Sequence, residues 1–117
     1  MLNRNENSTA RRGKQALFAE LPFLTSLIDL AVKLIHPKKI ILFGSRARGD
    51  HGRTSDVDIA FFFRKDPYQW ARFVAEAEED LPTLLELNLV DVHSASPAIL
   101  ESIKKEGICV YERKKPL

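Results

Sequence analysis

The segment that most restricts the fold of this chain is a short apolar run with two aspartates directly before it. Residues 59–63 read Ile-Ala-Phe-Phe-Phe, and Asp56 and Asp58 stand just ahead of them. A continuous run of this length predicts a strand that is covered on both faces. The fold must therefore cover both faces of a sheet and also accommodate two carboxylates at the start of one of its strands.

Three more apolar runs predict further strands, and helical patterns alternate with them. The strands are expected at residues 40–43, 56–63, 87–93 and 108–111. Helices are expected at residues 14–20, 22–36, 66–81 and 96–106. The order predicts an α+β (α/β) fold, in which helices pack on a small mixed sheet of about four strands.

Several residues predict where the helices begin and end. Asp66-Pro67 and Ser96-Pro97 each offer a capping side chain followed by a proline at the first helical position. Pro37 is expected to end the helix before it, and Gly107 to close the last one.

The length of 117 residues fits one domain. We expect a flexible tail at residues 1–13, the folded domain at residues 14–112 and a basic tail at residues 113–117. The one cysteine, Cys109, excludes an internal disulfide and a CxxC zinc site, and its apolar neighbours predict a buried thiol.

The charge is unevenly distributed along the chain. Residues 1–19 carry four basic residues and one acidic residue, residues 104–117 carry five and two, and residues 20–103 carry nine and thirteen. An acidic body argues against a broad nucleic-acid-binding face, so nucleic acid is not expected as a direct substrate. No apolar run is long enough to span a membrane and the first residues are polar, so a cytoplasmic protein is expected.

The segment from Gly44 to Gly49, Gly-Ser-Arg-Ala-Arg-Gly, suggests a phosphate site. Gly44 and Ser45 directly follow a predicted strand, where a glycine lets a ligand approach the backbone. Arg46 and Arg48 add guanidinium groups that match phosphate oxygens. The pattern GxxxxGK[ST] of a P-loop is absent. We therefore predict a nucleotide site formed by Gly44, Ser45, Arg46, Arg48 and Ser55.

Asp56 and Asp58 are two residues apart in a predicted strand, so their side chains share a face. Two such carboxylates repel each other, and divalent cations relieve that repulsion. Mg²⁺ prefers carboxylate and phosphate oxygens, and a pair of ions can clamp both oxygens of an in-line displacement. On the next strand Asp91 is a lone acid between valines, and we predict that it completes the metal site and assists deprotonation.

Gly44-Ser45, ten intervening residues and then Asp56-Val57-Asp58 resemble the signature of the minimal nucleotidyltransferases, a branch of the DNA polymerase β-like superfamily. The resemblance is strongest over residues 40–60. It implies a nucleotidyltransferase fold, an NTP such as ATP on the Gly-Ser turn, two Mg²⁺ ions on Asp56 and Asp58, and a third carboxylate at Asp91.

The resemblance also implies a partner. Bacterial members of this size often occur beside a small helical protein of the HEPN type. In some pairs that protein is a toxin that receives AMP from its antitoxin, and in others it is described as a substrate-binding subunit. The sequence fits both settings.

Less specific interpretations stand beside these predictions. Asp56 and Asp58 can be solvated residues at the start of a strand, Asp91 an acid on an edge strand, and one of Arg46 and Arg48 a partner of a nearby acid. The alternative to a transferase is an antitoxin or regulatory subunit that binds nucleotide or its partner without turnover.

Overall fold

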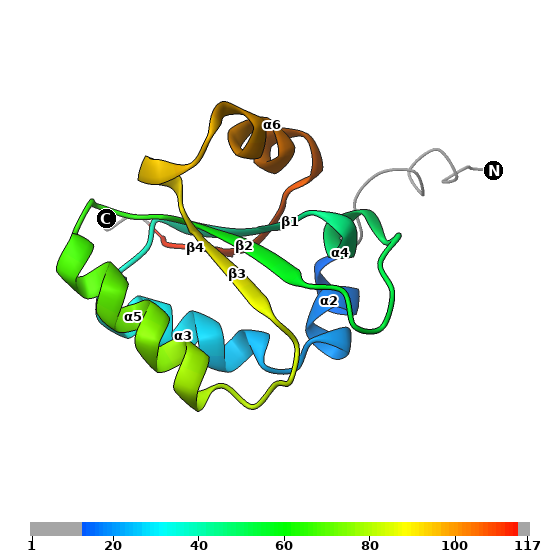
Figure 1. Ribbon diagram of the computed structural model, residues 1–117, viewed down its shortest axis with the longest axis horizontal. Helices are drawn as coiled ribbons and strands as arrows, with labels where there is room; N and C mark the ends of the chain where they lie inside the picture. Colours follow the sequence, from blue (N-terminus) through cyan, green and yellow to red (C-terminus); the bar gives the residue numbers. More distant parts are fainter. Residues whose placement is uncertain (1–12, 115–117) are drawn as a thin grey trace.

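The computed structural model describes residues 13–114, and a four-stranded sheet lies at its centre (Figure 1). The strands are β1 (Lys39–Phe43), β2 (Val57–Phe62), β3 (Leu87–Asp91) and β4 (Ile108–Glu112). Their order in the sheet is β3-β2-β1-β4. β1 runs antiparallel to β2 and β4, whereas β2 and β3 are parallel. The predicted mixed sheet of about four strands is therefore confirmed.

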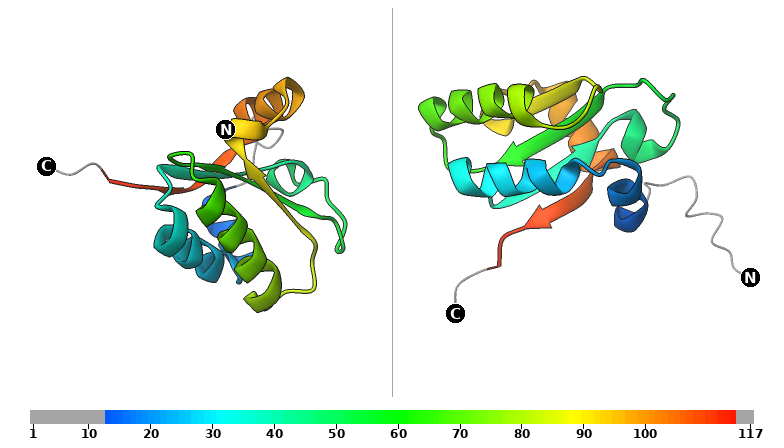
Figure 2. Two further views of the ribbon diagram at one scale, coloured as in Figure 1. Left: turned by 60° about the vertical axis from the view of Figure 1, so that its left-hand side comes forward. Right: turned by 90° about the horizontal axis from the view of Figure 1, so that it is seen from below.

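Helices cover both faces of this sheet. The helices are α2 (Lys14–Glu20), α3 (Leu24–Ile35), α4 (Ser45–Arg48), α5 (Pro67–Asp80) and α6 (Pro97–Glu106), with a short 3₁₀ helix η1 (Val92–Ser94) after β3. α3 and α5 lie side by side under one face, and α6 crosses the other (Figures 1 and 2). This arrangement explains why the apolar run in β2 is continuous.

Alternate residues of β2 face two separate cores. Phe61 belongs to the larger core, under α3 and α5, where its ring meets Phe73 edge to face at 4.9 Å and Trp70 at 5.6 Å between centroids. Ala60 belongs to a smaller core under α6, together with Ile103. Because side chains alternate along a strand, Asp58 shares the α6 face with Ala60.

The predicted helix caps form as expected. The Asp66 side chain accepts a hydrogen bond from the Gln69 N–H at 3.1 Å, and Ser96 Oγ accepts one from the Ile99 N–H at 3.2 Å. Gly107 follows α6, yet its φ of −64° is open to any residue. Its glycine is required because a Cβ there would collide with the Ile41 side chain and the Ile103 carbonyl.

Two predictions about β3 and β4 need correction. Cys109 is exposed rather than buried, because β4 lies at the edge of the sheet and only the alternate residues Ile108 and Val110 face inward. β3 ends at Asp91 instead of His93, because the chain turns there into η1.

Most of the predicted tails fall outside the part of the chain that is described, which leaves out residues 1–12 and 115–117. Within residues 13–114, no helix combines the length and the apolar character that crossing a bilayer requires.

Replacing Phe61 by alanine tests the larger core. Phe61 is fully buried and contacts two aromatic rings, so Phe61→Ala should lower the free energy of unfolding by about 3–5 kcal/mol. Urea denaturation measures the change. The control Leu84→Ala removes a fully exposed side chain and should stay within about 0.5 kcal/mol of the parent. Equal losses in the two variants would contradict this placement of the core.

Candidate functional site

A pocket of about 450 Å³ opens between the sheet, α4 and the last turn of α6. We call it the Gly44 pocket. Its polar lining includes Gly44, Ser45, Arg48, Asp58, Asn88 and Glu106. Four of the residues predicted from sequence, Gly44, Ser45, Arg48 and Asp58, therefore meet in one place.

The pairing of β1 with β2 brings the Gly-Ser turn to the acids. Phe43, the last residue of β1, is opposite Asp58 in the antiparallel register, so Gly44 follows directly beside that carboxylate. Gly44 has a φ of 80°, and a Cβ there would collide with Oδ2 of Asp58. Only glycine therefore fits at this position, for reasons of both backbone conformation and space.

Asp56 and Asp58 point toward the same neighbouring side chain, Asn88 of β3. Nδ2 of Asn88 donates to Oδ1 of Asp58 at 2.8 Å and to Oδ2 of Asp56 at 3.3 Å. Asn88 is opposite Asp58 in the parallel register of β2 and β3. The two carboxylates are thus close enough to share one donor, and that donor lines the Gly44 pocket.

The structure does not bring Asp91 to this pair. Asp91 is opposite Phe61, three positions further along β3, and Phe61 faces the core under α3 and α5. Oδ1 of Asp91 instead accepts from the N–H of His93 at 2.9 Å and lies 2.7 Å from Nδ1 of that ring. Within residues 13–114, no three His, Cys, Asp or Glu side chains gather closely enough to hold a metal ion. Asp91 thus lies on the other face of the sheet from the acidic pair.

Arg46 also points away from the Gly44 pocket. Its side chain is 3% exposed and pairs with Oε2 of Glu20 at 2.6 Å. Its remaining donors bind backbone carbonyls of the loop, among them those of Ser55 and Arg53, both at 3.1 Å. Arg46 therefore fastens the loop that precedes Asp56 to α2.

Ser55 is part of that same loop. Its Oγ accepts a hydrogen bond from the Gly52 N–H at 2.8 Å. Neither Arg46 nor Ser55 lines the Gly44 pocket, so of the five residues predicted to bind nucleotide, Gly44, Ser45 and Arg48 are the ones that meet there.

Arg48 and Glu106 connect the turn to α6. Nη1 of Arg48 lies 3.1 Å from Oε2 of Glu106, and Oε1 of Glu106 accepts from the Gly44 N–H at 3.1 Å. Nε of Arg48 donates to Asp50, and this hydrogen bond lowers the pKa of the Asp50 carboxyl and raises that of Arg48. Arg48 thus places a cation at the rim of the pocket.

Sequence reasoning missed Asn88 and Glu106. The alternation Leu87-Asn88-Leu89 carries the signal for Asn88, because two leucines that face the core put the residue between them on the opposite face. Glu106 has a weaker signal, since only tertiary packing brings the end of α6 to the turn.

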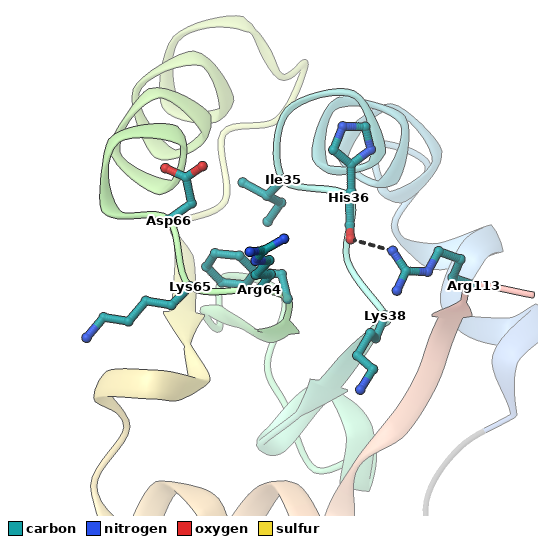
Figure 3. A pocket seen from close by; sticks show the side chains of 8 residues that line it. Ile35, His36, Lys38, Arg64, Lys65, Asp66 and Arg113 are labelled. Atoms are coloured by element: carbon teal, nitrogen blue, oxygen red, sulfur yellow. Dashed lines mark hydrogen bonds between the residues drawn. The ribbon is translucent and has the colours of Figure 1, made fainter. Parts of the chain in front are cut away.

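A second, larger pocket lies at the opposite end of β1 and β2. It has a volume of about 870 Å³, and Lys38, Arg64, Lys65 and Arg113 surround it (Figure 3). Arg113 donates to the His36 carbonyl at 3.2 Å. The one acid in its lining, Asp66, caps α5. Since this basic pocket has no pair of carboxylates, the Gly44 pocket is the candidate for metal-dependent chemistry.

Comparison with known proteins assigns a family to the chain. The family model described as "Polymerase beta, Nucleotidyltransferase" matches residues 25–116. No curated protein sequence matches the chain significantly.

Several solved structures share the fold. A toxin–antitoxin complex crystallised with AMP-PNP is 25% identical, with a TM-score of 0.60 over 77% of this chain and 73% of that one. A variant of the toxin–antitoxin MntA–HpeT is 25% identical, with a TM-score of 0.61 over 77% and 72%. A complex of MNT antitoxin with tri-AMPylated HEPN toxin from Shewanella oneidensis is 22% identical, with a TM-score of 0.57 over 80% and 73%.

Gly44→Ala tests the close approach of the turn to Asp58. A methyl group there requires a strained φ and displaces the carboxylate, so we expect a loss of about 1–2 kcal/mol in the free energy of unfolding. The control is Gly52→Ala, where the nearest atom to an added Cβ is Ser55 Oγ at 3.8 Å. Thermal or urea unfolding compares the two, and a Gly52→Ala loss as large as that of Gly44→Ala would refute the argument.

Arg46→Gln and Arg48→Gln should differ in stability. Arg46 is buried, pairs with Glu20 and donates to loop carbonyls, so its replacement removes several hydrogen bonds at once and should cost about 1–3 kcal/mol. Arg48 is 45% exposed, so Arg48→Gln should change stability much less. Chemical denaturation of both variants measures the difference. The reverse order would mean that Arg46, not Arg48, belongs to the pocket.

Proposed function

Because the chain belongs to the polymerase β nucleotidyltransferase family, we propose that it transfers a nucleoside monophosphate from an NTP, most simply AMP from ATP, to an acceptor hydroxyl and releases pyrophosphate. One observation carries this proposal. The turn at Gly44-Ser45 and the carboxylate of Asp58 line one pocket, and Asn88 of the same lining bonds both Asp58 and Asp56, although ten residues separate the turn from Asp56 in sequence.

The Gly44 pocket offers groups suited to a triphosphate. Ser45 lines it. Arg48 lies at the rim with its side chain 45% exposed. We propose that Ser45 donates to phosphate oxygens and that Arg48 neutralises part of their charge. Gly44 leaves the backbone open to the ligand.

Asp56 and Asp58 fit a Mg²⁺ site. Mg²⁺ is typically bound by one or two carboxylates together with substrate phosphates, and both kinds of ligand meet here. The shared hydrogen bond from Asn88 shows that both carboxylates can point to one place. Bound Mg²⁺ would neutralise the charge that develops on the phosphate and the leaving group. Asp56 and Asp58 are therefore the metal ligands in this proposal.

A helical partner of the HEPN type is the proposed acceptor. The similar structures include an MNT antitoxin in complex with an AMPylated HEPN toxin and a toxin–antitoxin complex with AMP-PNP. On that basis we propose that this chain binds ATP and modifies a hydroxyl of a HEPN-type protein. It would then serve as the antitoxin of the pair.

A binding role without turnover is the alternative, and one observation favours it. The side chain beside the two acids is the amide of Asn88, so within residues 13–114 no third carboxylate adjoins the pair to accept the proton of the attacking hydroxyl. A chain of this kind can still bind NTP and inhibit its partner by contact.

Asp58→Asn tests the transferase. The chain is incubated with its co-expressed HEPN-type partner, Mg²⁺ and ATP, and the partner is then weighed by intact-mass spectrometry. We expect the parent chain to add AMP to the partner and Asp58→Asn to add none, because the amide cannot replace an anionic metal ligand. The fold should survive this isosteric change, which circular dichroism checks.

Glu79→Gln is the matched control. Glu79 is an exposed carboxylate on α5, away from the Gly44 pocket, and its loss should leave transfer unchanged. Full transfer by Asp58→Asn would refute the metal assignment. A stable complex with no mass shift for the parent chain, whichever NTP is supplied, would favour the binding role.

A further inference from the structure

We propose that Asn88, rather than Asp91, is the third residue of the metal centre. Because the Asn88 side chain is neutral, we further propose that the protein without nucleotide binds one divalent ion firmly. This inference rests on the proposed function, since it concerns the same site. It changes the expected metal content from two ions to one until a nucleotide is bound.

The position of Asn88 follows from the sheet. β2 and β3 are parallel, and Asn88 is opposite Asp58 on the face that α6 covers. Its amide lies within hydrogen-bond distance of both Asp56 and Asp58. Asp91 is three positions further along and on the other face, where it binds His93. Of these two β3 residues, Asn88 is therefore the one placed to bind an ion together with the acidic pair.

The charge at the site supports one ion. Asp56 and Asp58 together supply two negative charges, which balance a single divalent cation. An amide oxygen is a neutral ligand and adds no charge. A second cation brings two more positive charges, and no further described acid is placed to balance them.

The other acid in the lining of the Gly44 pocket, Glu106, is already engaged. It accepts from the Gly44 N–H and pairs with the Arg48 guanidinium. A second ion must therefore take most of its anionic ligands from nucleotide phosphates, which agrees with the habit of Mg²⁺ of binding through phosphate oxygens.

The amide also has a role while no cation is bound. Both of its hydrogen bonds in this structure are donated from Nδ2, so the amide satisfies the two carboxylates. The terminal torsion of asparagine is soft and nearly two-fold, so rotation can turn Oδ1 toward a cation. Asn88 is thus a positioning residue that holds the two acids together before the ion arrives and can become a ligand afterwards.

Binding of Mn²⁺, without nucleotide, tests this assignment directly. Mn²⁺ serves as a probe because the loss of the free-ion electron paramagnetic resonance signal counts bound ions. We expect the parent chain to bind at most one Mn²⁺. Asn88→Asp adds a carboxylate and should tighten binding by about tenfold or more. Asp91→Asn, which removes the other acid of β3, should leave binding unchanged.

Thermal unfolding gives a second readout that does not depend on catalysis. Asn88→Asp places three carboxylates together, so its Tm should fall below that of the parent in a metal-free buffer. Adding Mn²⁺ should raise the Tm of Asn88→Asp more than that of the parent. If Asn88 had a structural role alone, Asn88→Asp would lower the Tm in metal-free buffer, but Mn²⁺ would not raise its Tm more than it raises that of the parent.

The outcomes separate this inference from the proposed function. If Asp91→Asn weakens Mn²⁺ binding, if Asn88→Asp does not tighten it, or if the parent binds two ions without nucleotide, the inference is overturned. If the Mn²⁺ results hold but neither the parent nor Asn88→Asp transfers AMP to a partner, the assignment of Asn88 stands and the transferase proposal fails.

Discussion

The antiparallel pairing of β1 with β2 is the constraint on which the site depends. It places Phe43 opposite Asp58, so the turn after one strand meets the acids at the start of the other. The carboxylate of Asp58 fills the space where a side chain at Gly44 would be, and Glu106 accepts a hydrogen bond from the Gly44 N–H. A shift of this register by one residue would turn Asp58 into the core and separate the acid from the turn.

Much of the fold could be predicted because local patterns determine it. The apolar runs marked all four strands, and Asp66 and Ser96 marked the starts of two helices. The observed ends of the elements differ from the predicted ones by a few residues where tertiary packing determines them, as at the end of β3. The convergence of the Gly-Ser turn with Asp58 was also predictable, because a recognised spacing joins the two segments.

The rest of the site depends on contacts between distant segments, which no local pattern reveals. Arg46 and Arg48 look equally suited to phosphate binding in the sequence. In the structure Arg46 is buried and pairs with Glu20 of α2, whereas Arg48 pairs with Glu106 of α6 at the pocket. The choice between Asn88 and Asp91 required the parallel register of β2 and β3 and the face that each residue occupies. An aspartate in a strand is easily recognised in a sequence as a candidate metal ligand, whereas an asparagine such as Asn88 is not.

Crystals grown with Mn²⁺ and a non-hydrolysable ATP analogue would test the central claim most directly, since anomalous scattering locates the metal. The account predicts Mn²⁺ bound by the carboxylates of Asp56 and Asp58, with the phosphates of the analogue against Ser45. Mn²⁺ bound at Asp91, or the analogue bound in the basic pocket between Lys38 and Arg64 while the Gly44 pocket stays free, would contradict it.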